Sequence, residues 1–226
     1  MRFSTPIILL TVALTACDQE TDRPLLQEPV GPTQAEVLEP VREVEGVTCT
    51  VGLEKASYTV GEIPKAKVVL HNGSGEELVL PRGLDGSEAG WRYPHCGFEV
   101  FDEHKKPIQL GGIARCGNMS TLSKGDFAKL GAGDSLNLSE NGYAGYWGLY
   151  QISSKPGTYW IRHYYLTSGG PVEDYFGDER MLLELKKDEP DVEFELDPAI
   201  VKLAGEIPKV TVYSEMVKLV IEPKAD

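Results

Sequence analysis

The stretch Ser154-Lys155-Pro156-Gly157-Thr158-Tyr159-Trp160-Ile161-Arg162 decides the fold of this chain. Its Pro-Gly turn opens into a run that continues as HYYLT to Thr167 and is rich in aromatic and β-branched side chains. Such residues are enriched in strands because they pack well on a pleated, half-buried surface. We therefore predict a strand over residues 158–167, entered through a tight turn.

Further strands are predicted on both sides of this one. Short apolar or alternating runs are separated by Gly, Pro and Asn turns, with little helical periodicity. The runs fall at residues 47–53, 66–72, 77–81, 98–102, 107–110, 127–138 and 209–222. Hairpins are expected at residues 66–81, 98–110 and 127–138. Repeated short strands of this kind predict an all-β protein, an antiparallel β-sandwich.

Residues 170–206 are the weakest part of this strand pattern. Short helices are predicted there, near Asp178–Lys187 and near Pro198–Ala204. We interpret the segment as a small, partly helical insertion between the last two strands of the sandwich.

The turn and strand quoted first resemble the sixth strand of immunoglobulin-like sandwiches. In those domains a Gly-Thr/Ser-Tyr turn leads into an inward-facing strand, and the tyrosine hydroxyl bonds back to nearby backbone. The resemblance implies this role for Tyr159. Antibody domains carry a cysteine two positions later, where this chain has Ile161, so their inter-sheet disulfide is absent. The rhythm of residues 47–222 is also similar to that of bacterial immunoglobulin-like domains, including uncharacterised lipoproteins and BsuPI-type proteinase inhibitors.

The N-terminus has the layout of a secretory signal peptide. One early positive charge, Arg2, precedes an apolar run from Ile7 to Leu14, which is too short to span a bilayer. The next residues complete Leu14-Thr15-Ala16-Cys17, which resembles the bacterial lipobox. The resemblance implies cleavage after residue 16 and a lipid anchor, including palmitate, on Cys17. Such an anchor would hold the protein at the inner or outer membrane of the cell envelope, on the periplasmic or surface side.

Residues 17–45 follow as the lipidated cysteine and a tether. Proline and acidic residues are frequent there and aromatic residues are absent, so the segment has no reason to pack. As flexible coil it would span on the order of 30 Å. The immunoglobulin-like domain is then expected over residues 46–224. The formal net charge of −13, without a basic patch, argues against nucleic acid as a partner.

Three cysteines remain after Cys17: Cys49, Cys96 and Cys116. Folding residues 98–110 about a turn at Asp102–Lys106 brings residue 96 close to Cys116. We predict a Cys96–Cys116 disulfide, which the exported compartment permits. Cys49 would then be a small buried strand residue.

No set of residues in the chain predicts catalysis. The four histidines lack a metal-ligand spacing, and neither a GxSxG nor an SxxK motif occurs, so no catalytic residue, metal or cofactor is expected. The aromatic stretch NGYAGYWGLY reads as a loop leading into a strand, and Tyr143, Tyr146 and Trp147 either fill the core or form an exposed partner-binding patch.

Three functions stay open at this point. The first is a non-catalytic, membrane-anchored envelope lipoprotein that binds or scaffolds a protein or glycan. The second is a proteinase inhibitor of the BsuPI type, with residues 139–149 as the inhibitory loop. The third is a carbohydrate- or peptidoglycan-binding module that uses the aromatic patch.

Overall fold

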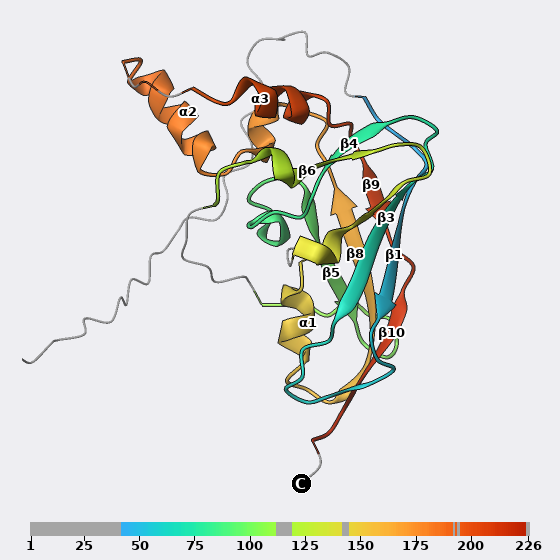
Figure 1. The fold of residues 1–226 in the computed structure, drawn as a ribbon. Coiled ribbons are helices and arrows are strands. Elements are labelled where there is room, and N and C mark those ends of the chain that lie inside the picture. The colour runs from blue at the N-terminus through green and yellow to red at the C-terminus, as the bar shows by residue number, and fades with distance from the viewer. Residues whose placement is uncertain (1–41, 112–118, 142–144, 192, 194, 225–226) are drawn as a thin grey trace, which may run out of the picture. The chain divides into compact units, whose positions relative to one another are not determined.

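The computed structural model describes residues 42–111, 119–141, 145–191, 193 and 195–224, which belong to one compact unit of the chain (Figure 1). The predicted signal peptide, Cys17 and most of the predicted tether lie outside these residues. Within the described part, no helix is long and apolar enough to cross a membrane.

The fold is rich in β-structure, and the strands among the described residues form three sheets. One sheet has the order β1-β3-β7, from Val47–Leu53, Ala66–Asn72 and Ser135–Asn137. The second has the order β2-β10-β8-β5, from Tyr58–Thr59, Val217–Glu222, Gly157–Leu166 and His95–Phe101, and β9 (Thr211–Tyr213) also pairs with β8. The third pairs β4 (Leu78–Pro81) with β6 (Phe127–Leu130). All strand pairs are antiparallel except β2 with β10.

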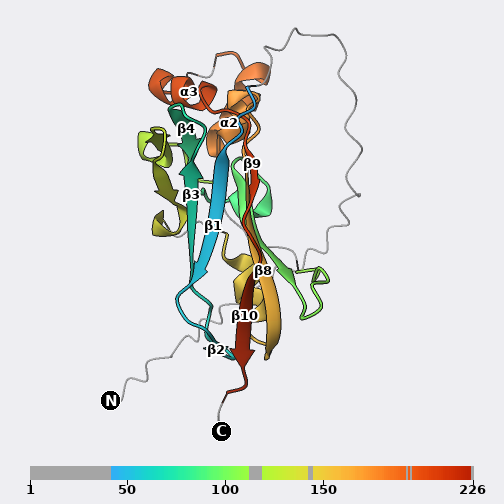
Figure 2. The same cartoon turned by 90° about the vertical axis from the view of Figure 1, so that its right-hand side faces the viewer.

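The two larger sheets share one hydrophobic core. Figure 2 shows β1 and β3 in one layer and β8 and β10 in the next. Alternate residues of β8 turn inward, and Ile161 on this strand is fully buried. Burial of one such side chain contributes roughly 1.5–3 kcal/mol. The predicted strand at 158–167 is therefore confirmed, with the expected inward phase.

The predicted hydrogen bond of Tyr159 is also confirmed. Its hydroxyl donates to the carbonyl oxygen of Lys155 at 3.2 Å, which closes the turn before β8. The predicted run at 209–222 forms two strands, β9 and β10, with an interruption that begins at Ser214. There the Ser214 hydroxyl accepts a hydrogen bond of 2.9 Å from the backbone N–H of His163 and so replaces a backbone partner in the ladder.

Two of the three predicted hairpins are wrong. The strands on either side of Asn72-Gly73 do not pair, because β3 joins β1 and β7 whereas β4 joins β6. Likewise β6 and β7 belong to different sheets. Both turns are crossovers that leave one sheet for another. The local hydrophobic pattern predicts which residues of a strand face the core. It does not predict which other strand pairs with it.

The third predicted hairpin is confirmed at its turn and in the first residues of its returning arm. The Asp102 carboxylate accepts hydrogen bonds from the backbone of His104 and Lys106, at 2.9 and 2.8 Å. The returning arm makes an isolated bridge between Pro107 and Phe101 rather than a strand. Beyond Pro107 the pairing continues only through the N–H of Ile108, which donates to the carbonyl oxygen of Val100 at 2.8 Å.

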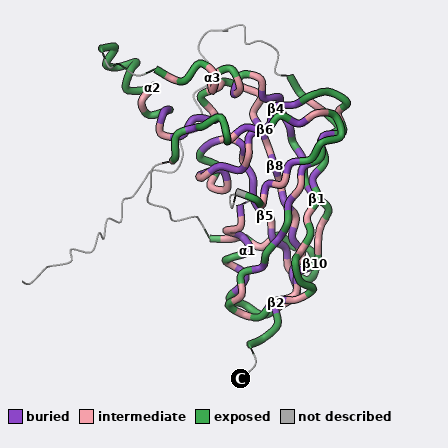
Figure 3. The backbone as a smooth tube through the Cα atoms, viewed as in Figure 1, coloured by how far each residue is buried: buried purple, intermediate pink, exposed green. Residues whose placement is uncertain are grey.

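The segment between β8 and β9 contains both predicted helices, α2 (Asp178–Asp188) and α3 (Pro198–Gly205). The Asp197 carboxylate caps α3 by accepting from the N–H of Ala199 at 2.8 Å. A second hydrophobic cluster lies here, built from Val79, Leu84, Leu122, Phe127, Tyr175, Phe176, Ala204 and Ile207. The segment therefore packs against the β4–β6 sheet. Figure 3 shows that α2 is largely exposed, in contrast to β5.

Residues 147–152 form helix α1 (Trp147–Ile152), where a loop leading into a strand was predicted. Leu149 and Ile152, three residues apart, are both buried and place one face of this short helix on the core. Gly148 allows close approach, because a Cβ there would lie 2.9 Å from the carbonyl oxygen of Phe98 on β5. Gly148 thus allows α1 to lie directly against the edge strand β5.

Candidate functional site

The two described cysteines are buried in strands. Cys49 lies on β1, as predicted, and its sulfur is 3.8 Å from Nδ1 of His163. Cys96 lies on β5 and is fully buried. Burial raises the pKa of each thiol to about 12, so neither is a thiolate nucleophile near neutral pH. Cys116 lies outside the described residues, and the disulfide between it and Cys96 stays a prediction.

The predicted aromatic patch is divided between two hollows. Tyr146 donates a hydrogen bond of 2.6 Å to the carbonyl oxygen of Ala66, and its ring packs on Phe98. It lines a hollow of about 650 Å³ whose surface is largely apolar. Trp147 lines a different pocket and stacks on Tyr150, with ring centroids 5.3 Å apart. Tyr143 lies outside the described residues.

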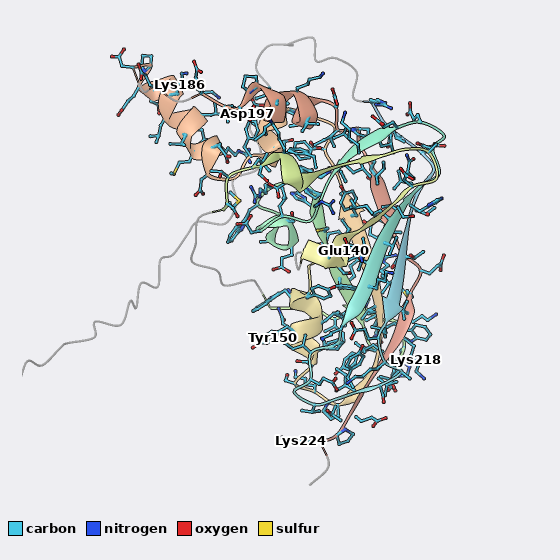
Figure 4. All side chains as sticks on the ribbon, viewed as in Figure 1. Glu140, Tyr150, Lys186, Asp197, Lys218 and Lys224 are labelled. Atoms are coloured by element: carbon cyan, nitrogen blue, oxygen red, sulfur yellow. The ribbon has the colours of Figure 1, made fainter. Side chains whose placement is uncertain are left out.

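The pocket that Trp147 lines has a volume of about 330 Å³ and lies beside strand β5. We call it the edge pocket. Four parts of the chain meet there: the turn before β5, the β5–β8 sheet, the end of the returning arm at residues 110–111, and α1 with the residue before Tyr146. Its main lining residues are Glu88, Trp91, Gly97, Trp147, Gly148 and Tyr164. Figure 4 shows Tyr150 on α1, the helix that forms one wall of this pocket.

Two glycines make this arrangement sterically possible. Gly97 on β5 faces Tyr164 on β8, and a Cβ at Gly97 would lie 3.1 Å from the tyrosine hydroxyl. Gly145 has a φ of +75°, and a Cβ there would collide with the backbone of Gly97. The chain entering α1 can therefore lie directly against the edge strand.

The polar groups of the edge pocket include the indole of Trp147, the hydroxyl of Tyr164 and the carboxylate of Glu88. The indole N–H of Trp147 is buried and makes no hydrogen bond within the described part of the chain. Burial, with smaller effects from Cys96, Glu99 and Glu88, raises the pKa of Tyr164 to about 12, so its hydroxyl keeps its proton. A carboxylate oxygen of Glu88 accepts from the backbone N–H of Trp147 at 3.3 Å, which joins the two walls.

A third hollow surrounds Arg92, and its polar groups stabilise the fold. The guanidinium is 2 % exposed, pairs with Asp85, and donates to the carbonyl oxygen of Ser120 at 2.7 Å. Burial alone would raise the pKa of Asp85. Hydrogen bonds from Ser120 and the charge of Arg92 outweigh that effect and lower it. These groups satisfy one another, so they join the loops around residues 85 and 120.

The structure thus identifies pocket residues that the sequence analysis did not select. Trp91 comes from the turn before β5, and Tyr164 comes from the outward phase of β8. The alternation that places Tyr159 and Ile161 inward also places Tyr164 outward, and that signal was present in the sequence. Trp91 gives no comparable signal.

Comparisons with known proteins identify no relative of this chain. No protein-family model matches the chain, and no curated protein matches it. The function is therefore argued from the residues.

Proposed function

We propose that this protein is a lipid-anchored binding module of the bacterial cell envelope, and that it acts without catalysis. The anchor rests on Leu14-Thr15-Ala16-Cys17 and the apolar run before it. Two or three acyl chains hold a protein on a bilayer durably, whereas a single chain binds only marginally. The tether then lets the folded domain reach ligands near the membrane.

We further propose that the domain is an immunoglobulin-like sandwich. The order β1-β3-β7 opposite β10-β8-β5 matches the ABE and GFC strands of that architecture, with β2 beside β10. The Tyr159 bond to Lys155 matches the tyrosine corner, and Ile161 fills the place of the antibody cysteine. This likeness concerns the scaffold and carries no function by itself.

The edge pocket is the observation that carries the binding function. It combines aromatic walls with a few convergent polar groups, as small-molecule sites do. The buried thiols nearest to it have raised pKa values, and Arg92 is held in an ion pair. The groups around the pocket are suited to holding a ligand rather than to attacking one.

Two experiments test this proposal in cells. Labelled palmitate should enter the native chain and should not enter Cys17→Ala; incorporation into that variant would refute the anchor. A photo-crosslinking amino acid at position 91, in the wall of the pocket, should give adducts with envelope components. The same group at position 160, on β8 outside the pocket, is the control. Equal labelling from both positions, or none from 91, would refute the pocket as the binding site.

The inhibitor function is a second proposal that the described residues support less. Residues 139–149 include the turn Leu138–Asn141 and the start of α1, and Ser139 and Tyr146 are both hydrogen-bonded to Ala66. An inhibitory loop needs an exposed, extended segment, and residues 142–144 of this stretch lie outside the described part. A panel of proteases that the purified protein fails to slow would refute this alternative.

A further inference from the structure

We propose that the outer face of helix α2 binds a basic, amphipathic segment of a partner protein. The outer face is the side of the helix turned away from the sheets, and it consists of Asp178, Met181, Glu184, Leu185 and Asp188. The described residues that line the edge pocket all lie outside α2, so this is a second interaction surface. It is separate from the proposed function and does not depend on it.

Helix α2 carries apolar residues on the face that solvent reaches. Glu179 and Leu183, four residues apart, face the body: Glu179 is 7 % exposed, and Leu183 packs against the second hydrophobic cluster. In a helix of 3.6 residues per turn, the positions two before and two after Leu183 point away from the body. These positions hold Met181 and Leu185, which are 60 % and 44 % exposed. A helix that only covered the core would carry polar residues there.

The second half of α2 stands clear of the rest of the described chain. Residues 184–190 are all exposed, and Figure 1 shows the helix extending away from the sheets. A partner can therefore surround Met181 and Leu185 on more than one side, as a hydrophobic groove surrounds a single amphipathic helix.

Acidic side chains flank this apolar pair. Asp178, Glu184 and Asp188 lie on the same half of the helix as Met181 and Leu185. None of the three carboxylates forms an ion pair with another described residue. Positive charges on a partner would pair with them, and the apolar contact would strengthen the attraction by removing water. The chemistry that fits this face is therefore apolar at its centre and basic around it.

The same charges disfavour two other occupants. A second copy of the chain would place carboxylates against carboxylates, and a bilayer with anionic headgroups would repel them. The chain also remains acidic beyond the helix, since residues 184–197 hold seven acidic and two basic side chains. A basic partner is the occupant that both the apolar and the charged groups favour.

The test measures peptide binding to the full chain in zwitterionic lipid nanodiscs. A tag at the C-terminus captures the chain on a sensor surface, and empty nanodiscs are the reference. This end follows β10, which finishes far from α2 (Figure 1). Three helical peptides are the probes: one of leucine and lysine, one with glutamate in place of lysine, and one with serine in place of leucine. The first should bind saturably and lose affinity with added salt, and the other two should bind about tenfold or more weakly.

Variants locate the binding. Met181→Ser combined with Leu185→Ser should weaken binding of the first peptide about tenfold or more, with an unchanged circular dichroism spectrum because both side chains are exposed. Ile63→Ser is the matched control, since Ile63 is 46 % exposed and lies between β2 and β3. Glu184→Gln should weaken binding about threefold, whereas Glu103→Gln, in an exposed turn, should not.

Several results would overturn this assignment. They include no saturable binding of the leucine–lysine peptide, equal binding of the glutamate peptide, and equal losses from the α2 variant and Ile63→Ser. Dimerisation of the native chain that the α2 variant abolishes would assign the face to a second copy. Slower amide exchange in α2 in nanodiscs than in detergent would assign it to the bilayer. Failure of the captured chain to retain nanodiscs would count against the lipid anchor alone.

Discussion

The side-chain amide of Asn72 donates a hydrogen bond of 2.9 Å to the carbonyl oxygen of Leu130, 58 residues further along the chain. The same amide donates to Glu76 and Gly131, at 2.7 and 3.0 Å. These acceptors lie in or beside the two crossovers that run between the β3 sheet and the β4–β6 sheet. Asn72, which is fully buried, therefore joins both crossovers at one corner of the fold.

Asn72→Ala should lower the free energy of unfolding by about 2–4 kcal/mol, because it leaves several buried carbonyl groups without a donor. Urea denaturation followed by circular dichroism measures this change. Ser74→Ala is the control: its hydroxyl bonds to the Asn72 side chain at 2.6 Å and is only partly buried, so we expect a loss below about 1 kcal/mol. Equal losses in the two variants would contradict the role of Asn72.

Arg92→Met should destabilise the protein by about 3–5 kcal/mol, because it leaves the carboxylate of Asp85 without its buried partner. Thermal and urea unfolding report the change. Arg42→Met removes an exposed pair with Glu76 and should cost less than about 1 kcal/mol. A loss at position 92 as small as that at position 42 would show that the buried pair does not hold these loops.

Tyr159→Phe should cost about 1 kcal/mol, since it removes the single hydrogen bond to Lys155 and keeps the buried ring. Tyr213→Phe, on a residue that is 45 % exposed, should be nearly neutral. The comparison uses urea denaturation of both variants. A neutral Tyr159→Phe would mean that the turn before β8 does not depend on this bond.

The free energy of unfolding should decrease at mildly acidic pH because of the protonation of His95. Burial lowers its pKa below the ordinary value of 6.5, and the nearby Asp174 carboxylate opposes the effect in part. The unfolded chain then binds a proton at higher pH than the folded chain. The stability that neutral His95 contributes to the folded state is therefore complete above pH 6.5. It declines as the pH falls below that value.

His95→Gln removes this contribution, so its free energy of unfolding should vary less between about pH 7.5 and pH 5 than that of the native protein. Urea denaturation at a series of pH values measures the slopes. His104→Gln changes an exposed turn residue and should leave the slope as it is. Identical slopes for His95→Gln and the native chain would refute the assignment.

Alkylation tests the state of the cysteines. In the folded protein Cys49 should not react with iodoacetamide, because it is buried and its thiol pKa is about 12. In denaturant without reductant, Cys49 should react, whereas Cys96 and Cys116 should not if they form the predicted disulfide. Mass spectrometry reads each site. Alkylation of Cys96 before reduction would refute the pairing.

Local sequence signals were sufficient for much of the fold. The strands at 47–53 and 66–72 and the helices near 178–187 and 198–204 lie where the residue pattern predicted them. The pattern failed at residues 147–152, where glycine and aromatic residues indicated a loop leading into a strand and the chain forms α1. There Gly148 lets the helix lie close to the backbone of β5, and that contact is not local in sequence.

By itself, therefore, the sequence determined the β-rich class, the inward phase of β8 and the turn that Tyr159 closes. These features depend on the alternation and turn chemistry of neighbouring residues. Only the tertiary structure decided which sheet each strand joins, and that Trp91, Trp147 and Tyr164 line one pocket. Strand pairing and pocket composition depend on residues far apart in the chain, whose approach is set by how the whole core packs.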